Sequence, residues 1–239
     1  MAILEGVRVH KHFGGLAAIS NVDFQVDRGE IVGLIGPNGA GKTTLFNLIS
    51  GAVPLDAGEI RFKGDRISGK KSYQVRRSGV ARTFQSVRIF PNVSVLENVI
   101  LAAHFGAPGR RSSIQATQEA LELLEFTGFS VPAATLAKDL PLAQQKKLEV
   151  ARALASRPEL LLLDEVIAGL NPTETSQAME LVTRIRDRGI TILMIEHVMK
   201  AIMAICDRII VLHYGVKLAE GPPAEIVNNP AVIEVYLGK

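Results

Sequence analysis

Gly36-Pro37-Asn38-Gly39-Ala40-Gly41-Lys42-Thr43 decides how this chain folds. The stretch fits the pattern G-x-x-x-x-G-K-[ST], a glycine-rich loop whose backbone N–H groups surround phosphate oxygens at the start of a helix. Residues 31–35 before it predict a short buried strand, and residues 44–49 after it predict the opening turns of a helix. The order strand, loop, helix favours a phosphate site over the alternative, a glycine-rich turn that binds nothing.

The residue types of this loop suit a nucleoside triphosphate. Glycines let the backbone approach phosphates without a Cβ in the way. Lys42 can reach the β- and γ-phosphates, and the hydroxyl of Thr43 can ligate Mg²⁺. All eight residues of the loop, together with Thr44 at the start of the helix, are therefore candidate nucleotide-binding residues.

Composition and charge limit the class of protein. Of 239 residues, 47% are hydrophobic and 21% charged, which indicates a globular chain. A net charge of +3 is too small to favour nucleic acid as a partner. We expect no signal peptide and no membrane-spanning segment, because no basic segment precedes an apolar run and no long apolar stretch occurs. Cys206 is the single cysteine, which excludes an intramolecular disulfide, and its apolar neighbours predict that it is buried. The lack of disulfides and of a signal peptide together predict a reducing, cytoplasmic compartment.

The predicted strands and helices change in character along the chain. The first third predicts strands at residues 3–9, 21–26, 31–35 and 59–62. The middle predicts helices at residues 93–104, 114–126 and 143–156, with a loop at 106–113. The last part predicts a strand at 160–163, a helix at 173–187, a strand at 190–195 and a hairpin of 209–212 with 216–219. Short apolar strands that alternate with helices indicate an α/β fold with a parallel sheet, interrupted by a helical subdomain.

Two carboxylates follow the strand predicted at residues 160–163. Leu160-Leu161-Leu162-Leu163 leads directly into Asp164 and Glu165. In proteins with a phosphate-binding loop, such an Asp assists Mg²⁺ beside the phosphates. The acid after it can orient or deprotonate the attacking water. The alternative is a core strand with two solvated acids at its end, and the upstream loop favours the catalytic interpretation.

Two more polar residues follow strands. His197 comes after the strand at residues 190–195, so we expect it at the ligand-binding edge of the sheet, where an imidazole can hydrogen-bond the γ-phosphate. Gln85 follows a short strand predicted at residues 80–84 and is polar enough to contact a water or the metal. Without the other motifs, His197 would read as a structural or surface residue and Gln85 would not be singled out.

Together these motifs resemble the ATP-binding subunit of an ATP-binding cassette (ABC) transporter, and the resemblance covers essentially the whole chain. In this family, residues 36–43 correspond to the Walker A loop, Gln85 to the Q-loop and residues 160–165 to the Walker B strand. His197 corresponds to the switch histidine, and Ala168-Gly169-Leu170-Asn171 to a D-loop that usually ends in Asp.

The resemblance implies the fold, the cofactors and the site residues. It implies a P-loop NTPase core with an N-terminal antiparallel β subdomain and an inserted α-helical subdomain. The single domain of residues 1–239 would comprise a nucleotide-binding core (1–90 and 159–239) and a helical subdomain (91–158) that contains the signature region. Lys42, Thr43, Gln85 and Asp164 would hold ATP and Mg²⁺, with Thr43, Gln85 and Asp164 at the metal, and Glu165 and His197 would serve catalysis. Phe13 either stacks on adenine or is a core phenylalanine.

Subfamily features point to the LivG-like ATPases of branched-chain amino acid importers, a group that also includes urea and amide importers. They are Phe13-Gly14-Gly15-Leu16, Ala81-Arg82-Thr83-Phe84-Gln85, residues 90–98, residues 168–174 and Val235-Tyr236-Leu237-Gly238.

One segment departs from the family. Its signature, Leu-Ser-Gly-Gly-Gln, is replaced by Leu140-Pro141-Leu142-Ala143-Gln144. In the family, this segment closes over the γ-phosphate held by a second subunit, through the Ser hydroxyl and backbone N–H groups. Pro141 has neither a hydroxyl nor an N–H, although proline suits the first turn of a helix. We therefore expect a sound helix with weakened phosphate contacts.

The resemblance also implies partners and a location. It implies a second ABC ATPase subunit, in a homodimer or heterodimer, on transmembrane permease subunits served by a substrate-binding protein. The chain would be cytoplasmic and peripheral on the inner face of the membrane. Two alternatives remain: a regulatory subunit that hydrolyses ATP weakly or not at all, and a non-transport ABC ATPase. The second predicts tandem cassettes, a coiled coil or a strong basic patch, and the sequence has none of these.

Overall fold

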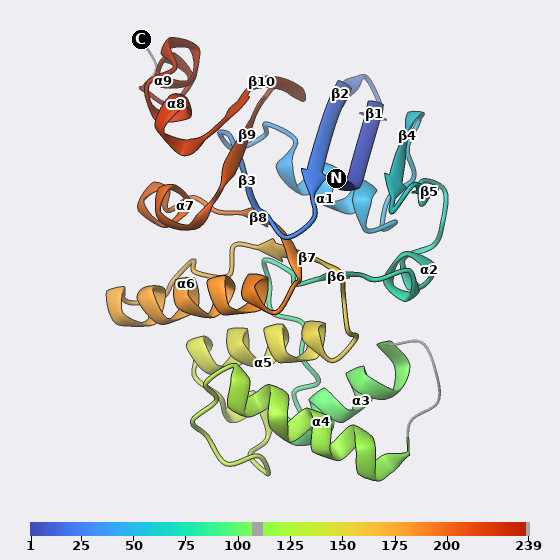
Figure 1. Cartoon of the computed structure of the whole chain (residues 1–239), viewed down its shortest axis with the longest axis vertical. Helices are drawn as coiled ribbons and strands as arrows, with labels where there is room; N and C mark the ends of the chain where they lie inside the picture. The colour runs from blue at the N-terminus through green and yellow to red at the C-terminus, as the bar shows by residue number, and fades with distance from the viewer. Residues whose placement is uncertain (107–111, 238–239) are drawn as a thin grey trace.

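The computed structural model describes residues 1–106 and 112–237, in which helices pack around two sheets (Figure 1). The strands are β1 (Ala2–Phe13), β2 (Leu16–Asp27), β3 (Ile31–Ile35), β4 (Ala57–Phe62), β5 (Asp65–Arg66), β6 (Val80–Arg82), β7 (Leu160–Asp164), β8 (Thr191–Ile195), β9 (Arg208–His213) and β10 (Val216–Gly221). The helices are α1 (Lys42–Ile49), α2 (Ser72–Arg77), α3 (Val95–Gly106), α4 (Ser113–Phe126), the 3₁₀ helix η1 (Ala137–Asp139), α5 (Leu142–Leu154), α6 (Pro172–Asp187), α7 (Met199–Ile205), α8 (Pro223–Val227) and α9 (Pro230–Leu237).

A six-stranded sheet of order β10-β9-β3-β8-β7-β6 forms the centre of the molecule. Its strands pair in parallel, except that β10 pairs antiparallel with β9. Alternate residues of β7 enter different cores: Leu160 and Leu162 pack on one side, and Leu161 and Leu163 on the other. Burial of both faces explains why these strands are continuous apolar runs.

A second sheet, of order β2-β1-β4-β5, is antiparallel and lies at the upper right of Figure 1, beside β10, β9 and β3 of the first. Helix α1 packs between the two sheets, because Leu45, Phe46 and Ile49 share one core with Ile3 and Leu4 of β1 and with the central strands. The loop of residues 36–43, at the start of α1, therefore lies next to both sheets.

Helices α3, α4 and α5 pack together on the side of the central sheet away from the antiparallel one (Figure 1). Their buried faces, with Val99 of α3, Ala120 of α4 and Leu148 of α5, join the core under the other face of the sheet. Helix α5 is followed along the chain by β7, and Glu165 is the residue after β7. The strand that carries Glu165 is therefore connected to this group of helices.

The structure confirms the predicted α/β fold, the parallel sheet, the terminal hairpin and the burial of Cys206. Several predicted bounds are wrong. Strands β1 and β2 run well beyond residues 3–9 and 21–26, because backbone pairing continues through polar residues and bulges such as that near Asn21, whose φ is 51°. The strand expected at 80–84 ends at Arg82, and residues 107–111 of the expected loop lie outside the described residues.

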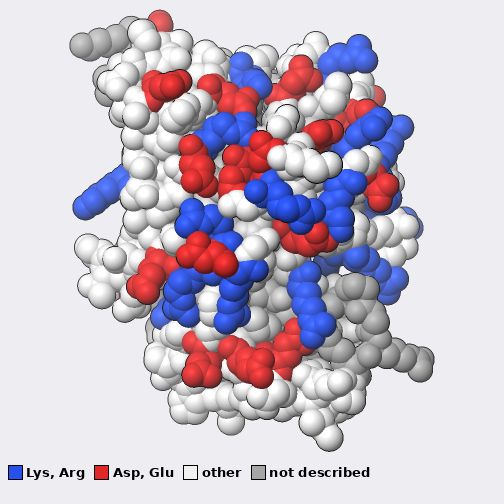
Figure 2. All heavy atoms as spheres, in the orientation of Figure 1, with Lys and Arg blue, Asp and Glu red and all other residues white. Residues whose placement is uncertain are grey.

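Charges of both signs are interspersed on the face shown in Figure 2. Ion pairs link parts of the chain that are distant in sequence, since Glu159 accepts from Arg28 at 3.0 Å and from Lys63 at 2.5 Å. These pairs connect the turns of the antiparallel sheet to the start of β7. Exposed pairs of this kind contribute little each, about 0–1 kcal/mol.

Candidate functional site

Most of the predicted site residues line one pocket of about 610 Å³. Its walls come from the β1–β2 turn, the loop before α1, the segments after β6, β7 and β8, and the β9–β10 turn. The lining residues are Phe13, Leu16, Ala17, Ala18, Asn38, Gly39, Ala40, Gly41, Lys42, Thr43, Thr44, Gln85, Glu165, His197 and Tyr214. Three predicted residues lie outside this lining: Gly36 and Pro37, which hold Lys42 from behind, and Asp164, which is buried.

The loop is shaped by glycines where the chain comes close to its neighbours. Gly41 has a φ of 103°, and a Cβ there would lie 2.5 Å from the carbonyl oxygen of Ala18 in β2. Gly36 is as close to the hairpin, since its Cβ would meet the Leu212 carbonyl at 2.2 Å. Gly41 caps α1, so the first amides of that helix face the pocket with the positive end of its dipole. A phosphate chain fits this cradle.

Lys42 is almost fully buried at the mouth of the loop. Its Nζ donates to the carbonyl oxygens of Gly36 at 2.7 Å and Pro37 at 3.0 Å. Burial lowers the pKa of Lys42, and the charges of Glu165 and Asp164 oppose that shift. The loop thus holds a preorganised cation facing two carboxylates.

Glu165 is the centre of a second cluster. His197 Nε2 lies 2.6 Å from Oε1 of Glu165, and Gln85 Nε2 donates to Oε2 at 3.0 Å. The contact with His197 is a hydrogen bond from the ring to the carboxylate in the tautomer that carries its proton on Nε2. The three residues follow β8, β6 and β7, which are neighbours in the sheet, and this explains why distant sequence positions meet. The structure therefore brings together the three residues expected at the hydrolytic centre.

Asp164 lies beneath the pocket in an ion pair that the sequence did not reveal. Arg82 donates to its Oδ2 at 2.8 Å, and both side chains are buried. Arg82 also donates to Asn47 of α1 at 2.6 Å, and the Asp164 amide donates to Thr83 Oγ1 at 3.1 Å. The pairing fixes the carboxylate between α1 and β6. An arginine inside a short buried strand was the available signal, because a buried charge requires a partner.

Two aromatic side chains border the pocket. Phe13 is 50% exposed, so the interpretation as a core phenylalanine is wrong. Tyr214, in the turn of the β9–β10 hairpin, is exposed too and was missed by sequence reasoning. Its signal was the dipeptide Tyr214-Gly215, whose φ angles of 47° and 77° make a tight turn that points an aromatic outward. Both side chains are positioned to contact a flat base.

The described residues contain no group of three or more His, Cys, Asp or Glu side chains able to hold a metal ion. A Mg²⁺ site here would use oxygen donors of other kinds, and Thr43, Gln85 and Asp164 supply a hydroxyl, an amide and a carboxylate. Because Gln85 directs its amide nitrogen to Glu165, its oxygen is free to face a metal. No helix among the described residues is long and apolar enough to cross a membrane.

The segment that departs from the family opens α5 as expected. Pro141 is its N-cap with φ −64°, and the helix begins at Leu142, one residue before the predicted start. Leu142 is 46% exposed and its Cδ2 would lie 3.2 Å from a Cβ at Gly169. Gln144 turns toward Ser130, to which its Nε2 donates at 3.0 Å. A bulky apolar side chain thus covers the start of this helix.

Comparison with known families and proteins decides the identity of the chain. Residues 19–168 match the family described as ABC transporter, and residues 216–239 match the one described as branched-chain amino acid ATP-binding cassette transporter. This chain belongs to the ABC transporter family. It is accordingly an ATP-binding cassette with ATPase activity, and it has the α/β fold described above.

Individual relatives of this cassette span its full length. It is 41% identical to the high-affinity branched-chain amino acid transport ATP-binding protein BraF of Pseudomonas aeruginosa, over 99% of this chain and 98% of BraF. It is 43% identical to the corresponding protein LivG of Escherichia coli, over 95% and 94% of the two chains. Among solved structures, an ATP-binding cassette in its ADP conformation superposes with a TM-score of 0.90 and 30% identity over 100% of both chains.

Proposed function

We propose that this ABC cassette is the ATP-hydrolysing subunit of an importer for branched-chain or related amino acids. The observation that carries the proposal is the Glu165 carboxylate, held by Gln85 and His197 in the pocket that Lys42 and the glycine loop border. The names of BraF and LivG supply the substrate class.

In the proposed reaction the loop binds the triphosphate through its backbone amides, and Lys42 neutralises charge on the β- and γ-phosphates. Thr43, the Gln85 amide oxygen and Asp164 would hold Mg²⁺, which when bound would supply positive charge next to the phosphate oxygens. Glu165 orients or deprotonates the water that attacks the γ-phosphate. His197 fixes that carboxylate and lies where it can contact the γ-phosphate, while Phe13 stacks on the adenine.

The assembly is part of the same proposal. A related cassette, 26% identical with a TM-score of 0.84, was solved as a dimer in a post-hydrolysis state with ADP and Pi. We infer a dimer with two ATP molecules at its interface, bound to permease subunits at the inner face of the membrane and served indirectly by a substrate-binding protein. Within each cassette, residues 91–158 form the helical subdomain, and residues 1–90 and 159–239 the core.

The surface beside Gln85 offers the permeases a docking groove of about 400 Å³. Tyr73 and Phe105 are exposed on its walls, and Arg76, Arg88 and Arg152 make it basic. Phe84, next to Gln85, lines the same groove, so a permease segment bound there would press on the segment that reaches the catalytic carboxylate.

Glu165→Gln tests the proposed function. Losing a general base or water-orienting group lowers kcat by roughly 10²–10⁴-fold, whereas equilibrium binding of ATP should stay within about threefold. Steady-state ATP turnover by the assembled complex and binding of a fluorescent ATP analogue measure the two effects. Glu180→Gln, an exposed change on α6, is the control and should turn over at the wild-type rate. Unchanged turnover in Glu165→Gln would remove this residue from the mechanism.

A further inference from the structure

Three buried charged side chains are unexplained by the nucleotide pocket. Lys146 and Glu149 lie one turn apart on α5, and Glu196 comes directly after β8. Their exposed fractions are only 9%, 6% and 2%. Burial of an ionised group is costly unless it is paired and hydrogen-bonded, so such a cluster needs a structural or functional reason.

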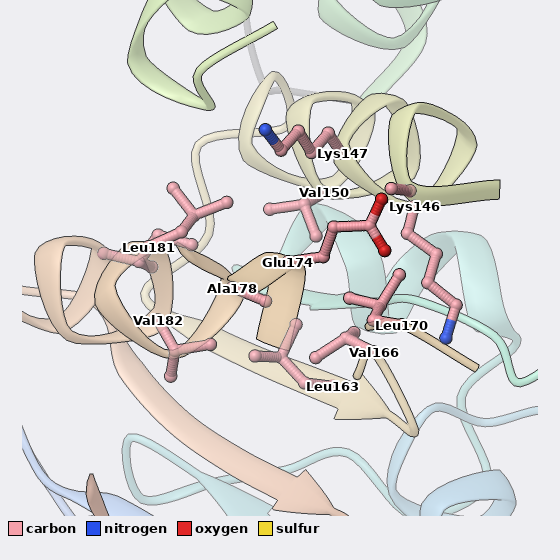
Figure 3. A pocket seen from close by; sticks show the side chains of 12 residues that line it. Lys146, Lys147, Val150, Leu163, Val166, Leu170, Glu174, Ala178, Leu181 and Val182 are labelled. Carbon is pink, nitrogen blue, oxygen red and sulfur yellow. The ribbon is translucent and has the colours of Figure 1, made fainter. Parts of the chain in front are cut away.

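The ammonium group of Lys146 binds the turn that carries Glu165. Its Nζ donates to the carbonyl oxygen of Glu165 at 2.8 Å and to that of Ala168 at 2.5 Å. In Figure 3 its stem runs beside Leu170 and its nitrogen lies beyond, whereas the nitrogen of Lys147 points to the other side of α5. The neighbouring Lys147 instead donates to the Gly128 carbonyl at the surface. Two adjacent lysines therefore have distinct contacts.

The two glutamates bind backbone near the other groups of the catalytic cluster. Glu196 Oε1 accepts from the Ile167 amide at 2.9 Å, on the same turn that Lys146 holds. Glu149 Oε1 accepts from the amides of Phe84 at 3.3 Å and Arg88 at 3.1 Å, on either side of Gln85. The three charged groups thus fasten the segments that carry Gln85 and Glu165, and one of them immediately precedes His197.

The turn requires such fastening. Glu165 has a φ of 53°, in the left-handed region that few residues other than glycine occupy. Such a conformation costs about 1–3 kcal/mol and persists only where surrounding contacts impose it. Beside the turn, the crevice between α5 and α6 is lined by apolar side chains that include Val150, Val166 and Leu170 and holds about 30 Å³ of free space (Figure 3). Apolar packing on that side of the turn is therefore incomplete. The hydrogen bonds of Lys146 hold the turn there instead.

We propose that Lys146 is a positioning residue for the catalytic carboxylate: by holding the carbonyls of Glu165 and Ala168, it fixes the turn that aims Glu165 at Gln85 and His197. Glu149 and Glu196 balance its charge and fasten the adjoining segments. Because Lys146 lies on α5, any movement of the helical group relative to the sheet reaches the catalytic turn through this side chain. The assignment rests on the proposed hydrolytic role of Glu165.

Lys146→Met, which keeps the length of the stem and removes the charge, tests the proposal in the assembled complex. We expect kcat for ATP to fall at least tenfold, while KM and the affinity for a fluorescent ATP analogue change less than threefold. Lys147→Met is the matched control and should keep the wild-type kcat. Lys146→Arg retains donors at this site and should recover part of the lost rate, which a mere cavity would not explain. Equal kcat for the two methionine variants would overturn the proposal.

Amide hydrogen exchange on the full chain gives a readout independent of turnover. Peptides that contain Ile167 and Ala168 should exchange faster in Lys146→Met than in Lys147→Met, because the turn has lost its clamp. Unchanged exchange would overturn the positioning role even if the wild-type complex proved inactive. Absence of ATP turnover in the wild-type complex, with the expected exchange difference, would instead count against the proposed function and leave the clamp standing.

Discussion

At the scale of single residues, the side chains of the site contact one another, and several buried charged side chains hold the backbone around them. Lys42 holds two loop carbonyls, Lys146 holds two carbonyls of the catalytic turn, and Glu196 holds an amide of the same turn. Sequence motifs identified Lys42, because the residues around it are characteristic. They did not predict the partners of Lys146 or Arg82, which are distant in sequence and come close only through packing of α5 and β6 on β7.

Glu196 makes a residue-scale prediction about pH. Burial raises the pKa of Glu196 to about 7, opposed by the Ile167 amide and by Lys146, while the charge of Glu165 adds to the rise. An acid whose pKa is raised in the folded state binds its proton more tightly there. The stability it contributes is therefore lost as pH rises from the unfolded value, about 4.5, to about 7, by about 3 kcal/mol.

Glu196→Gln cannot titrate and should lack this loss. Relative to the wild type, the free energy of unfolding of Glu196→Gln should rise between pH 4.5 and pH 7 and stay level above, as measured by urea denaturation across that range. Glu180→Gln, on the surface of α6, is the control and should follow the wild-type curve. A constant difference between Glu196→Gln and the wild type at all pH values would refute the raised pKa.

At the scale of elements, the conformation of the loop at residues 36–43 depends on the strands that pack against it. The β9–β10 hairpin binds the loop through the Gly215 amide, which donates to the Ala40 carbonyl at 3.0 Å, and β2 approaches Gly41 on the other side. The sequence predicted strand, loop and hairpin separately. Their mutual contact, and the role of Tyr214 in the pocket wall, follow from the packing of the antiparallel sheet on the central one.

Gly41→Ala and Gly39→Ala separate two requirements of this loop, a positive φ angle and the close approach of a neighbouring strand. Both glycines have positive φ, 103° and 80°, so each alanine is strained by about 1–2 kcal/mol. A Cβ at Gly39 meets nothing within 4 Å, whereas one at Gly41 lies 2.5 Å from the Ala18 carbonyl. Gly41→Ala should therefore destabilise the protein more than Gly39→Ala, by about 1–3 kcal/mol, since the clash forces off-minimum packing. Chemical denaturation of both variants measures the difference, and equal losses would show that the loop and β2 separate freely.

At the scale of the whole molecule, the residues of the pocket match the family's motifs, whereas the residues at the start of α5 depart from them. The pocket of this chain is lined by its loop, Glu165 and His197, but the start of α5, which would face a partner subunit in the proposed dimer, presents Pro141 and the exposed Leu142. In a heterodimer, the site that contains this Lys42 should be the more active. Glu165→Gln should therefore reduce turnover more than the matching change in the partner, and equal losses would contradict the asymmetry.

Restoring the family residues tests the same idea from the other side. Pro141→Ser with Leu142→Gly adds a hydroxyl and an N–H at the helix N-terminus and removes the bulk that packs toward Gly169. The ATP turnover of the assembled complex should rise several-fold, with the larger gain in a homodimer, where both sites carry the altered segment. A double variant that folds and binds ATP but turns over no faster would show that Pro141 and Leu142 do not limit hydrolysis.

The sequence by itself determined the α/β class, the loop at residues 36–43, the two acids at the end of β7 and the family, because each depends on residue types at short, fixed spacings. It did not determine the clamp on the catalytic turn, the Arg82–Asp164 pair or the exposed position of Phe13. Those features depend on which strands are neighbours in the sheet and on where α5 packs, and such long-range contacts follow from burial of the whole core rather than from any local pattern. Tertiary structure alone thus joins the helical group to Glu165 through Lys146.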